Sequence, residues 1–224
     1  MLFLFLLSTN TKSQQEVDLG SAGAFGVLSG SDGITNDGNT IVIGDVGTSG
    51  TRITGFPSGT VFGTEHINDD LAIKAHADAN RAYAQAKNLR SDHDFSTKTD
   101  LTGRTLYPGV YTSTTDFKLG GSLTLDAKNT TKIFVFQLGT SLDINLGSRI
   151  ILRNGAVASN IFWQVGNTAT FALKVEFVGT VLAYAAIIVN TGTTVDGRLI
   201  SNTSSVKLRN NVIKIPTHRQ VFVN

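Results

Sequence analysis

The feature that most constrains this chain is a repeated spacing of short apolar segments between Asn160 and Leu208. The segments Ala169–Phe171, Ile187–Val189 and Val206–Leu208 can be stacked, because their central residues lie 18 and 19 residues apart. A second set recurs at similar steps, namely Ile161–Trp163, Val181–Ala183 and Leu199–Ser201. Self-similarity at a nearly constant period is typical of a solenoid, in which each turn buries its apolar side against the next. The sequence therefore predicts an all-β solenoid.

Alternation within one of these segments predicts which side chains face the core. The large apolar residues share one parity: Ala169, Phe171, Leu173, Val175 and Phe177. The other parity holds smaller or more polar residues: Thr168, Thr170, Ala172, Lys174 and Glu176. Successive side chains of a strand point to opposite faces of the sheet. We therefore expect a coil with a buried apolar row and an outward row of Thr and Ala.

The composition agrees with strands that alternate with tight turns. The chain has 224 residues, of which 23 are Gly and 16% are charged. This length is enough for one sizeable core, and no shift in composition marks a second domain. The net charge of +2 indicates no nucleic-acid partner. Because Cys is absent, disulfides, Cys-ligated metals and thiol catalysis are excluded.

The N-terminus carries a short apolar run, Leu2–Leu7, followed by polar residues. The run is far too short to span a bilayer, so no membrane association is expected. It fits the apolar region of a secretory signal peptide, although a basic segment before it is missing. We predict a signal peptide at residues 1–14, a single domain at 15–224, and secretion. A frayed apolar N-terminus of a cytosolic protein is the alternative.

The hydrophobic period changes to that of a helix after residue 66. Apolar residues then recur at steps of three or four: Ile67, Leu71, Ala75, Ala79, Ala82, Ala86 and Leu89. Asn68 is the expected N-cap, and acidic residues follow it in the first turn. We predict one long α-helix at about 69–90 that packs along the solenoid axis, where its many Ala residues allow close approach to a sheet.

Strands are expected on both sides of this helix. Short apolar runs separated by Gly, Ser, Asp and Asn fill residues 17–60 and 106–137. In the next segment Leu142, Ile144 and Leu146 are expected to point inward. The last ten residues, which begin at Ile215, have the character of a tail or cap.

The residue patterns of catalysis and metal binding are missing from the sequence. The four His residues, His66, His76, His93 and His218, have no metal-ligand spacing, and no nucleophile elbow occurs. Carboxylates are too scattered to form an acid–base pair for glycoside cleavage. Trp163 is expected in the core. The triplets that begin at Asn129 and Asn202 match the N-glycosylation pattern, as a Thr-rich strand protein does by chance. We predict no enzyme activity, no cofactor and no metal.

Several short motifs, in order over nearly the whole chain, resemble the microbial β-helical ice-binding (antifreeze) protein family of bacteria, fungi and diatoms. They are Leu19–Ala22 with Phe25 and Val27–Leu28, Gly44–Gly47, Ile53–Phe56, Leu106–Tyr111, Asn160–Val165, Val181–Ala183 and Gly197–Leu199. The resemblance implies a discontinuous right-handed parallel β-helix with one long α-helix alongside. It also implies a secreted protein, expected to be a monomer, that adsorbs to ice through a flat sheet face and inhibits ice growth and recrystallisation.

Adsorption to ice requires a flat, stiff array of side chains rather than a titratable group. Thr suits such an array, because it offers one methyl and one hydroxyl on a side chain with restricted χ1. Coils stack at about 4.8 Å, and alternate residues of a strand lie about 6.7 Å apart. These spacings are comparable to repeats in the ice lattice, so many weak contacts can add.

Applying the same parity to every coil gives the predicted ice-binding residues. They are Ser141, Thr168, Thr170, Ala172, Ala186, Ile188, Asn190, Ser205 and Thr40, with Val42 beside Thr40. Charged Asp143, Lys207 and Arg209 interrupt this array. An alternative position for the face is offset toward Thr191, Thr193 and Thr194. Two other classes stay open: a polysaccharide-active enzyme and a secreted carbohydrate-binding adhesin, which would need exposed aromatic residues.

Overall fold

The computed structural model describes residues 16–97 and 99–216. Before the long helix, the chain forms η1 (Gly20–Ala24), β1 (Phe25–Ser29), β2 (Ile34–Asp37), β3 (Ile41–Ile43), β4 (Asp45–Thr48), β5 (Ile53–Thr54), β6 (Thr60–Phe62) and β7 (Glu65–Ile67). Helix α1 (Asp70–Asn88) follows. The predicted signal peptide, residues 1–14, lies outside the described residues, as do residues 217–224 of the predicted C-terminal tail.

After the helix the chain is almost entirely strands. They are β8 (His93–Asp94), β9 (Thr105–Leu106), β10 (Gly109–Ser113), β11 (Phe117–Leu119), β12 (Ser122–Asp126), β13 (Phe134–Leu138), β14 (Leu142–Ile144), β15 (Arg149–Arg153), η2 (Ala158–Asn160), β16 (Ile161–Val165), β17 (Ala169–Phe171), β18 (Glu176–Ala183), β19 (Ile187–Val189), β20 (Thr194–Ser201), β21 (Val206–Arg209) and β22 (Val212–Lys214).

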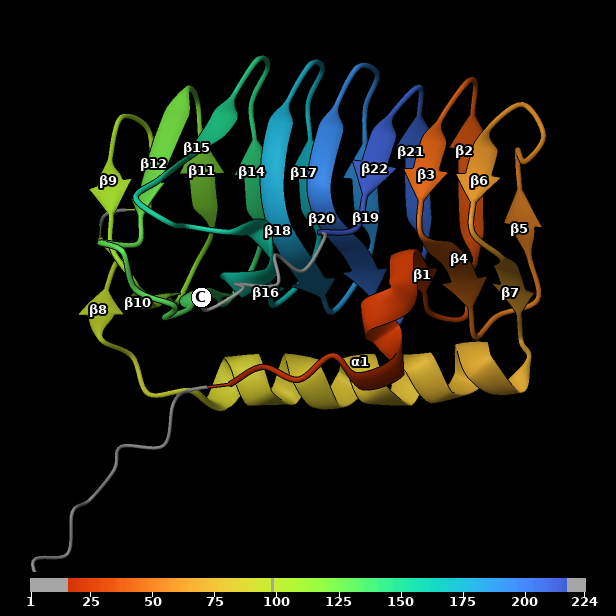
Figure 1. Ribbon diagram of the computed structural model, residues 1–224, viewed down its shortest axis with the longest axis horizontal. Helices are drawn as coiled ribbons and strands as arrows, with labels where there is room; N and C mark the ends of the chain where they lie inside the picture. Colours follow the sequence, from red (N-terminus) through yellow and green to blue (C-terminus); the bar gives the residue numbers. More distant parts are fainter. Residues whose placement is uncertain (1–15, 98, 217–224) are drawn as a thin grey trace, which may run out of the picture.

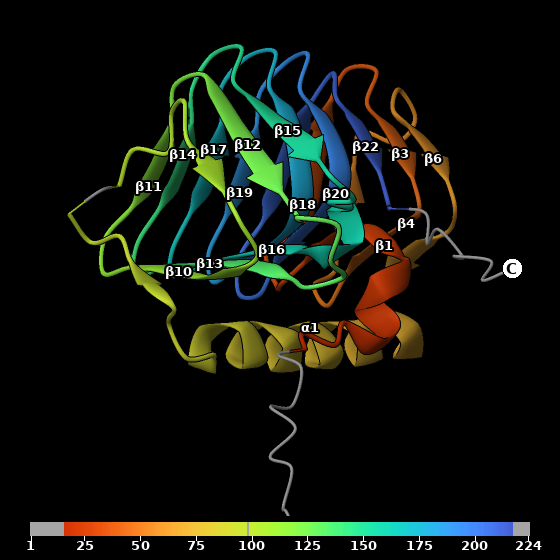
Figure 2. The ribbon, with the colours of Figure 1, turned by 60° about the vertical axis from the view of Figure 1, so that its left-hand side comes forward.

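These strands form stacked coils, each of which crosses three faces in turn (Figures 1 and 2). The covered face, which lies against α1, comprises β8, β10, β13, β16, the second halves of β18 and β20, β1, β4 and β7. The seven-stranded face has the order β11-β14-β17-β19-β21-β2-β5. The third face comprises β9, β12, β15, the first halves of β18 and β20, β22, β3 and β6. Neighbouring strands pair in parallel, as expected for a β-helix.

Strands β18 and β20 bend at glycines as they pass from the third face to the covered face. Gly179 has a φ of +110°, and a Cβ atom there would lie 2.7 Å from the Ile161 side chain. The facing residue is Gly197, whose added Cβ would overlap the carbonyl oxygen of Gly179. Only glycine allows the two coils to bend in register at this distance.

The order of the coils in space is discontinuous in sequence. The N-terminal strands β1, β2 and β3 pair with the C-terminal strands β20, β21 and β22. Helix α1 carries the chain along the stack from β7 to β8, so that the second part of the chain builds back toward the first (Figure 1). The prediction of a discontinuous coil order is confirmed.

Helix α1 is 19 residues long and slightly shorter than predicted. The N-cap is Asp69, whose side chain accepts a hydrogen bond from the Ala72 N–H at 2.8 Å, and not Asn68. Asn68 instead takes a left-handed conformation with φ of +50°, before the helix begins. At the other end, Gln137 Nε2 donates to the carbonyls of Ala86 and Leu89, which satisfies acceptors at the helix terminus.

The buried face of α1 consists mainly of Ala, which brings the helix close to the covered face. The buried residues are Ala72, Ala75, Asp78, Ala79, Ala82, Tyr83 and Ala86. The predicted series of buried helix residues was wrong at its first two members, since Leu71 is 39% exposed and Ile67 belongs to strand β7. Ile67 precedes the helix, and Leu71 lies in the first helical turn with its side chain exposed, so the buried face of the helix begins at Ala72.

The core between the faces contains a stack of aromatic rings. The rings of Phe136 and Trp163 are nearly parallel, with centroids 3.8 Å apart, and Tyr111 stacks on Phe136 at 5.4 Å. The register of β10, β13 and β16 places these three residues side by side. Trp163 is fully buried and its Nε1 donates to the Val178 carbonyl at 3.1 Å. The prediction that Trp163 lies in the core is confirmed.

Two residues that were predicted to point inward are exposed. Leu173 is 48% exposed and Leu146 is 65% exposed. The strand alternation ends at Phe171 and Ile144, and the chain then turns between the seven-stranded face and the third face. Leu146 and Leu173 each lie two residues beyond the last strand residue, inside the turn, so the strand parity no longer describes them.

Candidate functional site

The outward side chains of the seven-stranded face form straight rows across the coils. The central row runs through Lys118, Asp143, Thr170, Ile188, Lys207, Thr35 and Thr54. Because the strands pair without a register shift, each side chain in the row lies beside its neighbour at the strand spacing of about 4.8 Å. The row is therefore straight and evenly spaced.

Eight of the nine predicted ice-binding residues lie together on this face. Thr170 and Ile188 belong to the central row. Ser141, Thr168, Ala186 and Ser205 precede their strands, and Ala172 and Asn190 follow theirs. All eight side chains are intermediate in exposure. Each is partly covered by the residues above and below it, which limits its motion and flattens the surface.

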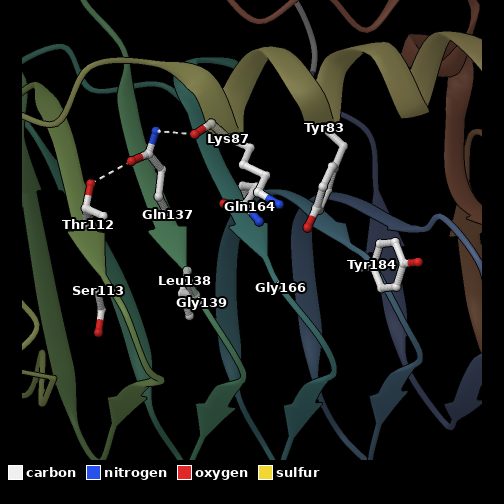
Figure 3. Close-up of a pocket in the computed structure, with 10 residues that line it drawn as sticks. All are labelled: Tyr83, Lys87, Thr112, Ser113, Gln137, Leu138, Gly139, Gln164, Gly166 and Tyr184. Carbon is white, nitrogen blue, oxygen red and sulfur yellow. Dashed lines mark hydrogen bonds between the residues drawn. The ribbon is translucent and has the colours of Figure 1, made fainter.

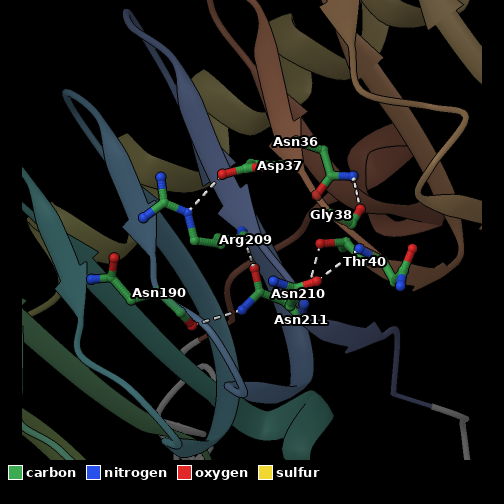
Figure 4. Close-up of polar contacts among 9 residues, drawn as sticks. Asn36, Asp37, Gly38, Thr40, Asn190, Arg209, Asn210 and Asn211 are labelled. Carbon is green, nitrogen blue, oxygen red and sulfur yellow. Dashed lines mark hydrogen bonds and ion pairs between the residues drawn. The ribbon is translucent and has the colours of Figure 1, made fainter.

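Thr40, the ninth predicted residue, does not belong to the surface. It is fully buried, and its Oγ1 accepts a hydrogen bond from the Asn211 N–H at 3.2 Å (Figure 4). Val42, which was predicted beside it, is also fully buried. The predicted parity was reversed here, because Ile41 and Ile43 are the exposed residues of β3 and Val42 points inward. Strand β3 also belongs to the third face, and the Thr40 hydroxyl stabilises the neighbouring coil.

Thr193, one residue of the predicted offset face, is buried for a similar reason. Its Oγ1 donates to the Ala172 carbonyl at 3.0 Å. In the same corner Asn211 Nδ2 donates to the Asn190 carbonyl at 2.8 Å (Figure 4). These side chains connect successive turns between the seven-stranded face and the third face. The polar corner holds the edge of the seven-stranded face in register.

Asn190 lies at the margin between this corner and the surface. Its Nδ2 donates to the Phe171 carbonyl at 2.9 Å. A side chain amide that is bonded to a backbone carbonyl has one less donor to offer to water. Asn190 therefore contributes mainly to the shape of the face.

Charged residues divide the seven-stranded face into zones. Arg209 Nε and Asp37 Oδ2 form an ion pair at 3.0 Å, and Lys118 Nζ pairs with Asp116 Oδ2 at 3.1 Å. Lys207 is exposed in the central row between Ile188 and Thr35. The widest uncharged zone therefore surrounds Thr170 and Ile188.

Asp143 lies beside Thr170 at one end of this uncharged zone. Burial raises the pKa of the Asp143 carboxyl, and the neighbouring Asp116 charge raises it further. The Lys118 ammonium acts in the opposite direction. The charged form of Asp143 is therefore disfavoured at this position relative to water.

Thr35 and Thr54 were not among the predicted residues. They extend the central row beyond Lys207, since Thr35 pairs with Lys207 and Thr54 pairs with Thr35. No period in the sequence connects residue 35 with residue 207, because the two coils meet only through the discontinuous stacking. The sequence signal that could have found them is the local alternation of apolar Ile34 and Ile53 with polar Thr35 and Thr54, which indicates two short strands.

A groove of about 520 Å³ lies between the last turns of α1 and the covered face (Figure 3). Its lining includes Tyr83, Lys87, Gln137, Gln164 and Tyr184, but no carboxylate. Burial raises the pKa of Tyr83. Within residues 16–97 and 99–216, no group of three His, Asp or Glu side chains is placed to hold a metal ion. In the same ranges, no helix has the length and apolar character that crossing a membrane requires.

The geometry is that of a β-helical class of protein, in which parallel coils stack beside one long helix and the seven-stranded sheet carries straight rows of outward side chains. The chain belongs to the Ice-binding-like family, whose model matches residues 27–214. The fold and the family agree with the resemblance that the short sequence motifs indicated.

Relatives from different kingdoms match nearly the whole chain. An "Ice-binding protein" of Nostoc sp. (strain HG1) is 37% identical over 92% of this chain and 76% of its own length. One of Colwellia sp is 34% identical over 91% of this chain and 85% of its own. The crystal structure of an ice-binding protein from the Antarctic ascomycete Antarctomyces psychrotrophicus has a TM-score of 0.88 and 40% identity. That match covers 90% of this chain and 99% of the other.

Proposed function

We propose that this protein binds ice through the seven-stranded face. The observation that carries the proposal is the straight array of small and β-branched side chains around Thr170 and Ile188, on a chain that belongs to the Ice-binding-like family. Adsorption there stops the growth and recrystallisation of the crystal. The binding residues are Ser141, Thr168, Thr170, Ala172, Ala186, Ile188 and Ser205, with Thr35 and Thr54 as an extension of the row.

The physical basis is preorganisation. The strands are bonded on both sides, and the aromatic core beneath them is closely packed. Because the scaffold has already lost its conformational freedom, many weak contacts with ordered water can add without a large further entropy cost. Methyl groups of Thr, Ala and Ile favour an ordered water layer, and Thr hydroxyls anchor it.

The other faces are less suitable for ice. Helix α1 lies over the covered face (Figure 1). The third face carries exposed charges, which hold their own water strongly: Arg149, Glu176, Asp196 and Lys214. Thr194 lies on the third face beside Glu176, so the predicted offset toward Thr194 would bring that charge to the ice.

We also infer the finer features of the molecule. The coils wind in the right-handed sense, as crossover connections between parallel strands do in nearly all proteins. The protein acts as an exported monomer without catalytic activity, since ice lies outside the cell and adsorption requires no reacting group. The short apolar run before residue 8 supports export.

Replacement of Thr170 by Tyr tests the position of the face. A ring there should hold the flat surface away from ice, so thermal hysteresis should fall strongly. The free energy of unfolding should change by no more than about 0.5 kcal/mol, as for other surface substitutions. Hysteresis and crystal shape are measured on purified protein, and circular dichroism checks the fold.

The matched control is Thr194→Tyr, which makes the same change at an exposed strand position on the third face. This variant should keep the hysteresis of the parent protein. If Thr194→Tyr loses activity while Thr170→Tyr keeps it, the third face binds ice and the proposed face is wrong. If the parent protein has no hysteresis, the proposed function itself fails.

A further inference from the structure

Two triplets in the chain have the pattern Asn-x-Ser/Thr of N-glycosylation acceptors, Asn129-Thr130-Thr131 and Asn202-Thr203-Ser204. We propose that Asn129 is an acceptor for an N-linked glycan in the exported protein and that Asn202 is not. The pattern alone does not distinguish the two triplets, but their surroundings in the structure do.

The first triplet lies in an exposed turn between β12 and β13. Asn129, Thr130 and Thr131 are all exposed. Lys128 and Asn129 both have positive φ, +52° and +55°, so the chain makes a tight left-handed turn at the acceptor. The turn is fixed by backbone contacts, because the Asn129 N–H donates to the Asn154 carbonyl at 2.8 Å. The Asn129 amide is therefore presented to solvent on a firm turn.

The second triplet is built into the fold. Asn202 is only 4% exposed, and its backbone N–H donates to the Ala183 carbonyl at 2.8 Å. His76 of α1 donates through Nε2 to the Asn202 carbonyl. The hydroxyl that the pattern requires, Ser204 Oγ, donates to Asp32 Oδ2 at 2.7 Å. A glycan on Asn202 would have to separate α1 from the last coils.

The position of Asn129 is compatible with ice adsorption. The turn at residues 127–133 connects the third face, through β12, to the covered face, through β13. The seven-stranded face is not part of this corner. A bulky, strongly hydrated glycan at Asn129 should therefore project away from the proposed ice-binding residues.

The reaction is the transfer of an oligosaccharide from a lipid diphosphate donor by an oligosaccharyltransferase of the export pathway. The Asn129 amide nitrogen forms a bond to the anomeric carbon of the sugar. The bond between that carbon and the diphosphate oxygen breaks, and the amide nitrogen loses one proton, which balances the charge on the leaving lipid diphosphate. The transfer involves no oxidation or reduction, so it requires no redox partner.

The test is expression of the full chain behind the secretion signal of a yeast host. The folded, secreted fraction is analysed by intact mass before and after peptide N-glycosidase, which converts a glycosylated Asn to Asp. Peptide mapping then locates the modified residue. The parent protein should carry one glycan, at Asn129. Asn129→Gln and Thr131→Val should lose it, whereas Asn202→Gln should keep it.

An unmodified Asn129 in the folded parent protein would overturn the proposal, and so would a glycan found at Asn202. Thr131→Val keeps the acceptor amide and removes only the hydroxyl, so loss of the glycan in this variant separates enzymatic transfer from nonspecific addition. Hysteresis should be equal before and after glycan removal, and a rise on removal would contradict the position of the glycan. The mass measurement does not depend on ice activity, so it can succeed even if the proposed function fails.

Discussion

At the scale of residues, a few charged side chains on the seven-stranded face bind water more strongly than the Thr, Ala and Ile side chains around them. Lys207 is the least suitable residue of the central row, because its ammonium binds water strongly between Ile188 and Thr35. The flanking Arg209 is at least paired with Asp37. The charge on Lys207 therefore separates the uncharged zone around Thr170 from Thr35 and Thr54.

Replacement of Lys207 by Thr should join these two zones. We expect thermal hysteresis to rise, because the row from Thr170 to Thr54 then lacks charge. Stability should stay within about 0.5 kcal/mol of the parent, since the side chain is exposed. Lys214→Thr on the third face is the control and should leave hysteresis unchanged. A fall in hysteresis for Lys207→Thr would contradict the assignment of the row.

Asp143 provides a prediction about pH at the same scale. Its folded-state pKa is raised by burial and by Asp116, so the folded state binds a proton more tightly than the unfolded state. The charged form therefore costs stability above the raised pKa. That cost disappears as the pH falls through the raised pKa and then below the ordinary pKa of an Asp carboxyl.

Replacement of Asp143 by Asn should accordingly raise the melting temperature at pH 7. The difference between variant and parent should shrink as the pH falls through the usual range of an Asp carboxyl. Comparing the two proteins at each pH cancels the contribution of carboxylates that are remote from Asp143, such as Asp78 and Asp126, whose pKa values are lowered. Thermal unfolding followed by circular dichroism measures this difference, and a difference that grows toward low pH would contradict the raised pKa.

At the scale of elements, helix α1 is held close to the covered face by small side chains. Ala75, Ala79 and Ala82 are fully buried. This contact leaves no room for longer side chains, and a well-packed interface resists added volume. The helix thereby makes this face of the sheet inaccessible to other molecules.

Replacement of Ala79 by Leu should destabilise the protein by about 1–3 kcal/mol, because the added atoms push the helix off the sheet. The matched change Ala77→Leu, at an exposed position of the same helix, should alter stability by no more than about 0.5 kcal/mol. Urea unfolding measures both. Equal effects of the two substitutions would argue against close packing of α1.

At the scale of the whole molecule, the discontinuous stacking joins chain segments that are remote in sequence. The pairs β1–β20, β2–β21 and β3–β22 connect the first coils to the last on all three faces. The central row of the seven-stranded face crosses this junction between Lys207 and Thr35. The complete surface that we propose for ice binding therefore exists only when both parts of the chain are folded and joined.

Features that depend on local periodicity follow from the order of the amino acids. Alternation within Ala169–Phe171 and Ile187–Val189 correctly predicts the inward side chains, and the three-to-four spacing of Ala predicts the long helix. These predictions succeed because the direction of a side chain within a regular strand or helix follows from backbone geometry alone.

The positions of side chains at turns and across the junction depend instead on contacts between coils. Thr40 and Thr193 are buried because their hydroxyls bond to backbone groups of neighbouring coils, whereas Leu173 is exposed because the strand has already ended. Thr35 joins the row beside Lys207 because the N-terminal coils stack on the C-terminal ones. Such contacts depend on which coil lies next to which, and a period along the chain contains no information about pairing between segments so far apart in sequence.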